Sequence, residues 1–338
     1  MSIRSKPEAL VVMDRGSFQA QFDHVRLERL GDLVAAADPV WVDELDSPAA
    51  RSRLGSAEVL LTSWGAPTLT PERLAAAPAL RAVFHSAGSV RPIVSSSVWS
   101  RGIRVTSAAR ANAIPVAEYT LAAIIFAGKK APFLARDPNA ATSVRDPARY
   151  GHLSNYRRTI GIVGFSQVGR RVVDLLGCLD TAECLVADPY AAADEVARAG
   201  ATLLDLRHML PRSEILSLHA PALATTRHMI GAAELALLPD HATVINTARG
   251  SLIDMDALAA ECGSGRLFAM LDVTDPEPLP PGHPLRAMPN VVITPHIAGS
   301  LGTEALRLSD LTLDELSRWI ADEPLHTEVT PADFALRA

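Results

Sequence analysis

The chain has few cysteines and no pattern typical of a metal site or a disulfide framework. Its 338 residues include three cysteines, Cys178, Cys184 and Cys262, an odd number without C-x-x-C or metal-ligand spacing. Disulfide frameworks occur in secreted proteins, whereas cytosolic proteins keep their thiols reduced. We therefore expect a cytoplasmic protein with reduced thiols and no bound metal.

The chain also has no long apolar run and no block of like charge. Its most apolar segment, residues 121–127, is far shorter than the roughly 20 residues of a membrane-spanning helix, so we interpret it as part of a buried helix. Charges and a proline precede the first apolar run, which argues against a secretory signal. The net charge of -6 argues against nucleic acid or a membrane as a partner.

The residues that are present predict two α/β domains. With 48% hydrophobic and 21% charged residues the chain is typical of globular proteins, and its length suffices for two domains. Strand and helix patterns alternate, which predicts parallel sheets with right-handed crossovers. We predict strands at 9–13, 40–45, 58–62, 80–85, 104–106, 159–163, 183–187, 215–218, 243–246, 268–272 and 291–294. Helices are predicted at 18–37, 112–130, 167–176 and 301–320, with an irregular connection at 136–158.

A glycine turn follows the first predicted strand of the second half. Gly164 and Gly169 match the outer glycines of the pattern G-x-G-x-x-G, whereas Ser166 occupies the middle position. The helix predicted from Gln167 would present free N–H groups and a positive dipole end to a pyrophosphate. Asp188 ends the next strand, about 20 residues after the turn, where an acidic side chain can bind the adenosine ribose.

Three polar segments come directly after other predicted strands. Arg249 could bind a carboxylate through its planar fork, or be a surface arginine in a turn. Glu277 lies in an acidic, proline-rich loop, where it could also be only a solvated charge. His296 could transfer a proton near neutral pH, or serve only as a structural or capping residue.

Together these three residues fit one reaction. The histidine would exchange the proton of a substrate hydroxyl, and a carboxylate on its other ring nitrogen would favour its protonated form. The arginine would hold a substrate carboxylate and polarise the neighbouring carbonyl, which a dihydronicotinamide would reduce by hydride transfer. This reaction requires no metal.

The same segments resemble motifs of the D-isomer-specific 2-hydroxyacid dehydrogenase family. Residues 248–250 and Asp254 resemble its arginine motif, residues 271–278 its L-D-V-x-x-x-E-P motif and residues 294–299 its T-P-H-I-A-G motif. The resemblance is densest from Asn112 to Ser300. It implies that the catalytic residues are Arg249, Glu277 and His296.

The resemblance also implies a fold, an activity and an assembly. The family fold has two doubly wound parallel-sheet domains with a cleft between them. Residues 1–111 and 297–338 would form a discontinuous, flavodoxin-like substrate domain, and residues 112–296 a Rossmann domain that binds NAD. The activity would be that of an NAD-dependent dehydrogenase for a small D-2-hydroxy acid, with a glyoxylate-, hydroxypyruvate- or phosphoglycerate-type substrate. A homodimer is also implied.

Further binding residues follow from the same resemblance. Asp188 implies NAD and not NADP, because no basic residue directly follows it. The implied cofactor contacts are Gly164, Ser166, Gln167, Val168, Gly169, Asp188, His219, Ala220, Pro221, Thr226, Thr247, Ala248, Arg249, Asp272, His296 and Gly299. The implied substrate contacts are Trp64, Ala87, Gly88, Ser89, Arg249 and His296.

The sequence departs from the family pattern in three places. Ser166 places a β-carbon where the backbone would approach the pyrophosphate. Residues 87–91 lack the usual glycine-rich, acidic loop sequence, which bears on the choice of substrate, and Arg110 replaces a glycine. Two other functions stay open: an NADH-sensing binding protein of the corepressor type, and a family member that acts on formate or phosphite.

Overall fold

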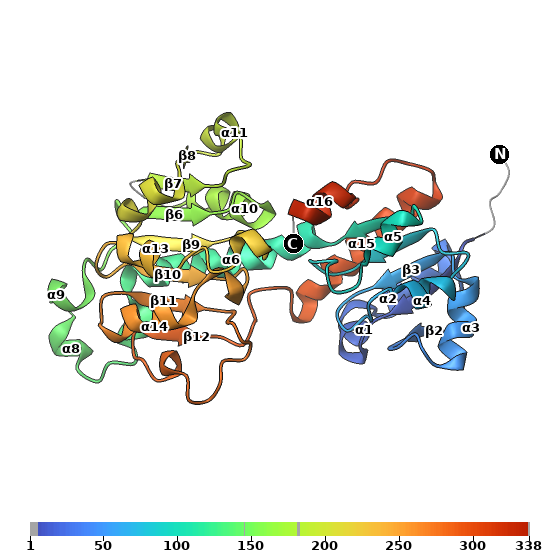
Figure 1. Cartoon of the computed structure of the whole chain (residues 1–338), viewed down its shortest axis with the longest axis horizontal. Helices are drawn as coiled ribbons and strands as arrows, with labels where there is room; N and C mark the ends of the chain where they lie inside the picture. Colours follow the sequence, from blue (N-terminus) through green and yellow to red (C-terminus); the bar gives the residue numbers. More distant parts are fainter. Residues whose placement is uncertain (1–5, 145, 181–182, 337–338) are drawn as a thin grey trace. The chain divides into compact units, whose positions relative to one another are not determined.

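The computed structural model describes residues 6–144, 146–180 and 183–336. The chain separates into two compact units, one formed by the residues up to Asn112 together with those from Ser300, the other by Ala113–Gly299 (Figure 1). Each unit contains a parallel sheet between layers of helices. The prediction of an α/β fold with two parallel sheets is confirmed. Residues 1–5, 145 and 337–338, which fall in the predicted substrate domain and connection, lie outside the described residues.

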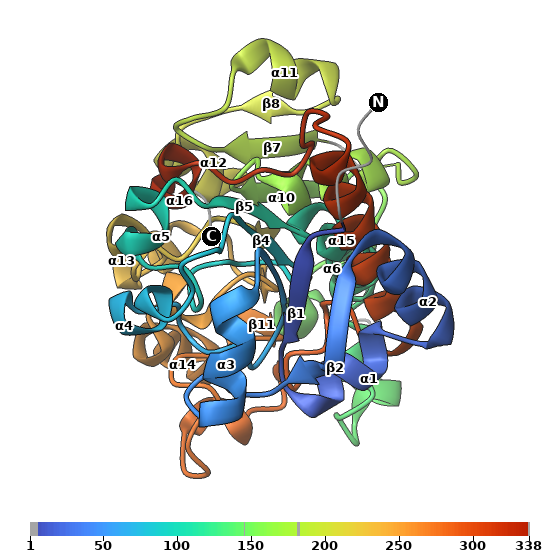
Figure 2. The ribbon, with the colours of Figure 1, turned by 90° about the vertical axis from the view of Figure 1, so that its right-hand side faces the viewer.

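The first unit has a flavodoxin-like sheet with the strand order β2-β1-β3-β4-β5. Adjacent strands are parallel throughout. Figure 2 shows β1 beside its partner β2. The switch point lies between β1 and β3, so the loop after β3, which carries Trp64, begins beside it. The strands are β1 (Glu8–Val12), β2 (Ala35–Val42), β3 (Val59–Thr62), β4 (Ala82–His85) and β5 (Arg104–Ser107).

Alternate side chains of this sheet enter two apolar cores. Leu10 and Val12 of β1 pack in one core, and Ala9 and Val11 in the other, because successive strand residues point to opposite faces. The first core is covered by α3 (Pro48–Ser56), α4 (Pro71–Ala75) and α5 (Ser96–Ser100). The second is covered by α1 (Arg15–Gln21), α2 (His24–Leu33) and α15 (Ala305–Ile320).

The prediction of one helix over residues 18–37 is wrong. The chain forms α1 and then α2, and Asp23 begins α2 by accepting a hydrogen bond from the Arg26 backbone N–H at 3.0 Å. From Ala35 the chain pairs with Glu8 of β1, so strand pairing ends the helical stretch. The cap residue Asp23 therefore divides this stretch into two helices, although the apolar periodicity continues past it.

The C-terminal segment covers the outer edge of β5. Residues 327–329 run antiparallel to this edge strand, with the Val329 N–H donating to the Val105 carbonyl at 2.8 Å. α16 (Pro331–Leu336) follows, and Phe334 packs against Trp99. Arg91, from the altered loop, donates to the Phe334 carbonyl at 2.5 Å, and its guanidinium lies 4.9 Å from the ring centre. The loop after β4 is thereby attached to α16.

The second unit contains a seven-stranded Rossmann sheet. Its order, β12-β11-β10-β9-β6-β7-β8, places the switch point between β6 and β9, and all its pairs are parallel. Its strands are β6 (Thr159–Val163), β7 (Glu183–Ala187), β8 (Thr202–Leu203), β9 (Ile215–Leu218), β10 (Thr243–Asn246), β11 (Phe268–Leu271) and β12 (Val291–Ile293). The strands predicted for this sheet are confirmed to within one residue at their ends, whereas β8 was not predicted because it has only two residues. In the first unit the strand predicted at 40–45 is wrong, because β2 begins at Ala35 and ends at Val42.

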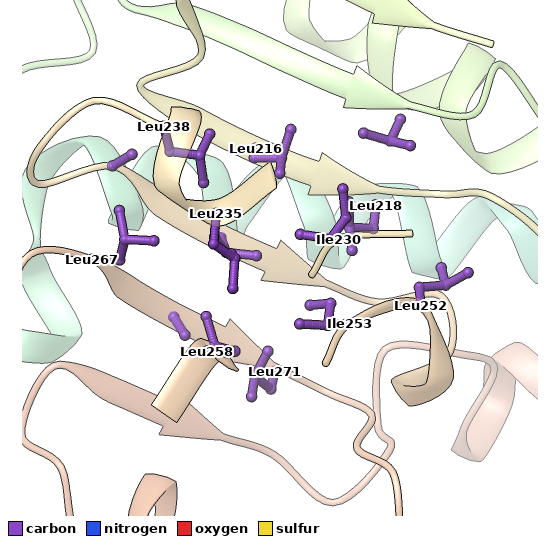
Figure 3. Close-up of a cluster of buried hydrophobic side chains, with 14 of the residues drawn as sticks. Leu216, Leu218, Ile230, Leu235, Leu238, Leu252, Ile253, Leu258, Leu267 and Leu271 are labelled. Atoms are coloured by element: carbon purple, nitrogen blue, oxygen red, sulfur yellow. The ribbon is translucent and has the colours of Figure 1, made fainter. Parts of the chain in front are cut away.

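Helices cover both faces of the second sheet. α6 (Ala109–Lys129) and α10 (Gln167–Leu176) pack on one face, and α13 (Ala232–Leu237) and α14 (Met255–Gly263) on the other. On this second face Leu235 and Leu258 belong to the same apolar core as Leu216 of β9 (Figure 3). The remaining helices are α7 (Ala131–Leu134), α8 (Ala140–Ser143), α9 (Pro147–Tyr150), α11 (Ala193–Arg198) and α12 (Leu206–Met209). Short 3-10 helices occur at Leu210–Arg212, Ala224–Thr226, Gly250–Leu252, Pro284–Arg286 and Gly302–Glu304.

The long helix α6 begins three residues before its predicted start. Pro115 therefore lies inside the helix and not in its first turn. By length and composition alone α6 could cross a membrane, but 56% of its most apolar window is buried within the structure. This burial is typical of a core helix.

Candidate active site

The glycine turn between β6 and α10 leaves no room for side chains at two positions. Gly164 has φ +94, and a Cβ there would lie 2.7 Å from the Ala220 backbone nitrogen. A Cβ at Gly169 would lie 2.0 Å from the Gly164 oxygen. Ser166 takes the helix N-cap instead, and its hydroxyl accepts from the Gly169 N–H at 3.3 Å. The missing middle glycine is thus replaced by a capping group.

Asp188 is fixed at the carboxyl end of β7. One carboxylate oxygen accepts from the Phe165 N–H at 2.7 Å and the other from the Tyr190 N–H at 2.8 Å. Each oxygen keeps a further lone pair, so ribose hydroxyls could still donate to it. Arg170, on the neighbouring helix α10, stacks on Phe165 and pairs with Glu195 at 2.8 Å.

His219 carries a buried nitrogen beside the glycine turn. Its Nε2 lies 2.9 Å from the Ser217 hydroxyl, whereas Nδ1 has no hydrogen-bond partner among the described residues. Burial lowers the pKa of this ring to about 3, so the ring is neutral at physiological pH. A buried polar atom without a partner is costly. This nitrogen and the two tight glycines fit a bound dinucleotide.

Two loops meet at the carboxyl ends of β10 and β11. The Asn246 side chain closes the first loop, accepting from the Ala248 N–H at 3.0 Å and donating to the Arg249 carbonyl at 2.8 Å. Gly250 then touches the second loop so closely that a Cβ would lie 2.0 Å from the Thr274 carbonyl. This contact brings Arg249 and Glu277 into one region.

The Arg249 side chain stays accessible, although protein atoms surround its other sides. This loss of solvent lowers the pKa of the guanidinium, and the Glu277 carboxylate opposes the shift. The residue remains a cation at any physiological pH. A fixed cation of this kind can bind a carboxylate.

His296 and Glu277 form a hydrogen-bonded pair. The His296 Nδ1 lies 2.6 Å from Oε1 of Glu277, and the two side chains are 50% and 42% exposed. Because Glu277 occupies Nδ1, a proton exchanged with a substrate would be carried by Nε2. The His296 backbone is left-handed, with φ +53, which is uncommon outside glycine.

Asp272 holds the loop that carries His296. Its buried carboxylate accepts from the Thr294 hydroxyl at 2.6 Å and from the N–H groups of Ile297 and Ala298 at 2.8 Å each. These three bonds fix the backbone on both sides of His296. The family resemblance implied a cofactor contact for Asp272 and gave no sign of this structural task.

The loops proposed to bind substrate in the first unit are tied together by buried hydrogen bonds. The Ser63 hydroxyl donates to the Ser86 carbonyl at 2.8 Å, and His85 lies 3.0 Å from the Thr62 hydroxyl. Burial lowers the pKa of His85 to about 4, and a hydrogen bond to the Ser89 backbone acts in the opposite direction. Ala87 is buried, Gly88 and Ser89 are half-buried, and the Trp64 side chain is 40% exposed. Their role in binding substrate stays a prediction.

The other predicted cofactor residues lie near the same edge of the Rossmann sheet. The Thr226 hydroxyl is engaged within its own loop, at 2.6 Å from the Pro221 carbonyl. Thr247 is buried and bonded to Thr120. Gln167 and Val168 begin α10, Ala220 and Pro221 follow β9, and Gly299 ends the second unit. Among the described residues no group of histidine, cysteine and carboxylate side chains could hold a metal ion.

Several residues that hold the site together were not predicted as site residues. Asn246 could have been found from its position two residues before Ala248, because asparagine often closes such turns. Tyr119 and Thr120 gave no comparable signal, since their partners are distant in the chain.

Comparisons with known proteins show what this chain is similar to. A sequence model described as the D-isomer specific 2-hydroxyacid dehydrogenase, NAD binding domain, matches residues 122–298. An (S)-sulfolactate dehydrogenase from Chromohalobacter salexigens is 33% identical over 249 residues, which cover 73% of this chain and 80% of that protein. A D-3-phosphoglycerate dehydrogenase from Mycobacterium tuberculosis is 30% identical over 272 residues, or 80% of this chain and 50% of that protein.

A solved structure extends the likeness to both units. The D-mandelate dehydrogenase of Rhodotorula graminis superposes with a TM-score of 0.80, at 20% identity, over 96% of this chain and 98% of that one. At this identity the superposition shows the fold alone. The chain spans about half the length of the phosphoglycerate dehydrogenases that it matches. With its match to the NAD-binding domain and its 33% identical relative, the chain belongs to the D-isomer-specific 2-hydroxyacid dehydrogenase family.

Proposed function

We propose that the protein is an NAD-dependent oxidoreductase that interconverts a small D-2-hydroxy acid and its 2-keto acid. The observation that carries this proposal is the His296–Glu277 hydrogen bond beside Arg249, at the carboxyl edge of an NAD-binding sheet. Relatives named for sulfolactate and phosphoglycerate support a small hydroxy acid as substrate. Glyoxylate, hydroxypyruvate and phosphoglycerate types are the substrates that we propose.

Each of the three side chains has a distinct task in the proposed reaction. Arg249 binds the substrate carboxylate and polarises the adjacent carbonyl. His296 holds the proton on Nε2 and delivers it to the carbonyl oxygen, while Glu277 orients the ring and favours its protonated form. NADH supplies the hydride when it is bound.

The cofactor residues in the proposal are those of the Rossmann edge. Gly164 and Gly169 allow the backbone to approach the pyrophosphate, and Asp188 accepts hydrogen bonds from the ribose. The unpaired His219 nitrogen supports a polar cofactor atom next to it. Asp188 also supports the choice of NAD, because a 2′-phosphate would meet its negative charge.

The test is oxidation of NADH by the purified protein with a panel of 2-keto acids, followed by the absorbance of NADH. We expect turnover with at least one of them, and a large loss in His296→Gln with NADH binding retained. Tight NADH binding with no turnover, together with a recovered protein partner, would favour a corepressor-like protein. Activity on formate or phosphite, with 2-keto acids inert, would establish the other alternative.

We also propose a cytoplasmic homodimer. Phe126 is 54% exposed on α6, and it is the residue that we place at the contact with a second copy. Cys184 and Cys262 are shielded, and the pKa of each thiol is raised to about 12, which fits stable reduced thiols. Light scattering at several concentrations tests the dimer, because Phe126→Ser should shift it to monomer. Cell fractionation tests the location.

A further inference from the structure

Helix α6 is attached to both catalytic loops through two neighbouring hydroxyl groups. The Tyr119 hydroxyl lies 2.9 Å from that of Thr294, at the end of β12, and the Thr120 hydroxyl lies 2.8 Å from that of Thr247, at the end of β10. Successive helix residues point about 100° apart, so neighbours can reach different strands. The two contacts therefore join one rigid helix to the loops of His296 and Arg249.

The hydrogen-bond directions follow from the partners. The Thr294 hydroxyl donates to the Asp272 carboxylate at 2.6 Å, so it must accept the proton of Tyr119. Burial raises the pKa of the Tyr119 phenol, the hydrogen bond to Thr294 opposes this shift, and the charge of Asp272 adds to it, so the phenol keeps its proton. The Thr120 hydroxyl donates to the Val116 carbonyl at 2.7 Å, so it accepts from Thr247. Each hydroxyl proton thus has one defined acceptor.

The first path ends at the backbone of the proposed proton carrier. Asp272, which receives the Thr294 hydroxyl, also accepts from the Ile297 and Ala298 N–H groups, and its carbonyl accepts from the His296 N–H at 3.0 Å. A left-handed histidine persists only where its surroundings determine the backbone strongly. Tyr119 adds one more constraint from outside the loop.

The second path ends next to the proposed carboxylate binder. Thr247 is buried and lies two residues before Arg249, in the turn that Asn246 closes. Thr120, which is completely buried, anchors this turn from the helix side. The Asn246 side chain therefore holds this turn from within, and Thr120 holds it from α6.

We propose that Tyr119 and Thr120 are positioning residues that hold His296 and Arg249 at the spacing a 2-keto acid requires. The inference rests on the proposed function for the roles of His296 and Arg249. Neither residue touches the reacting groups in this scheme. Tyr119 acts through Thr294, and Thr120 acts through Thr247. A small displacement of a catalytic side chain lowers the rate strongly.

Tyr119→Phe tests the first path, because it removes one oxygen and keeps the ring. We expect kcat to fall about tenfold while the Kd for NADH changes less than about twofold, since the loop is misplaced but the glycine turn is untouched. The matched control is Tyr156→Phe, a tyrosine of the same unit that is 63% exposed, and it should behave like the parent protein. Unchanged kcat in Tyr119→Phe would overturn the proposal, as would a parallel loss of NADH binding and thermal stability.

Thr120→Val and Thr120→Ser test the second path. Valine keeps the shape without the hydroxyl, so the KM for the 2-keto acid should rise several-fold, and serine should restore it. Failure of serine to restore the KM would assign Thr120 to packing alone and remove it from the proposal.

A readout without substrate separates this inference from the proposed function. We would label histidine with 15N and assign the His296 ring signals with His296→Asn. In Tyr119→Phe these signals should shift, and in Tyr156→Phe they should not. If the parent protein reduced no 2-keto acid yet the shift occurred, the proposed function would fail and the attachment would stand. If the His296 signals did not shift in Tyr119→Phe, the proposed attachment of the His296 loop to α6 would be overturned, whatever the activity of the protein.

Discussion

His296 shows how one residue combines chemistry with an unusual backbone. Its φ of +53 disfavours most side chains, whereas asparagine tolerates this region. We predict that His296→Asn keeps the fold and NADH binding but lowers kcat by roughly 100- to 10,000-fold, because the proton carrier is lost. Steady-state kinetics and NADH titration measure both quantities. If NADH binding fell as much as turnover, the histidine would be structural.

Two buried histidines make folding sensitive to acid. Burial lowers the pKa of His85 to about 4 and that of His219 to about 3, from 6.5 in the unfolded chain. The unfolded state therefore binds more protons below pH 6.5, and stability falls as the pH drops toward these values. For His85 alone the loss at pH 4 is about 3 kcal/mol.

We predict that the urea concentration at the midpoint of unfolding falls as the pH is lowered from 6.5 to 4. His85→Gln should flatten this fall, because glutamine does not titrate. His208→Gln, the same replacement at an exposed position, provides the control for the substitution itself. Identical slopes in all three proteins would show that other groups dominate the acid response.

At the level of single residues, the sequence motifs located Arg249, Glu277 and His296 because each sits in a strongly patterned segment. The sequence could not reveal that Asp272 holds the His296 loop or that Gly250 brings two loops into contact. Such tasks depend on which backbone groups lie nearby after folding. The catalytic role of the three residues stays a prediction.

Among the elements, α10 depends on Ser166 for its first turn. The serine hydroxyl accepts from the Gly169 N–H, and the loss of such a cap costs about 1 kcal/mol. We predict that Ser166→Ala lowers the free energy of unfolding by about this amount, measured in urea, and that Ser166→Thr restores most of it. An unchanged stability in Ser166→Ala would show that the cap bond contributes nothing.

Strands and helices were predictable to different degrees for physical reasons. The buried strands of the Rossmann sheet are short apolar runs between polar turns, so their bounds were clear. The stretch over residues 18–37 was not, because Asp23 caps a new helix within a continuous apolar pattern and Ala35 starts an edge strand. Local capping and strand pairing outweighed periodicity there.

For the whole molecule, the two units have separate apolar cores, so a ligand of one unit should protect that unit. We predict that NADH slows hydrogen exchange around β6, β7 and β9 more than in β1 to β5. At 100 times its Kd, NADH should add about 2.7 kcal/mol to the stability of the binding unit.

Asp188→Ala should weaken this protection, because the ribose contact is lost. Asp205→Ala is the matched control, an exposed carboxylate of the same unit whose side chain does not cap its helix. Hydrogen exchange with mass spectrometry measures both. Equal protection in Asp188→Ala and the parent protein would remove Asp188 from the ribose site.

The parallel pairing within both sheets was predictable at this scale, since alternating strands and helices favour parallel sheets with crossover helices. The covering of β5 by residues 327–329 was not, because its antiparallel bridge joins segments more than 200 residues apart and the register comes from backbone groups that the sequence does not mark.

That cover also bears on the lifetime of the protein in a cell. A β5 edge left open would present unpaired N–H and C=O groups to any other strand, which is how folded proteins begin to aggregate. A protease cut before Thr327 would release this edge together with α16, even if both sheets stayed intact. The C-terminal segment would therefore serve as a safeguard of solubility.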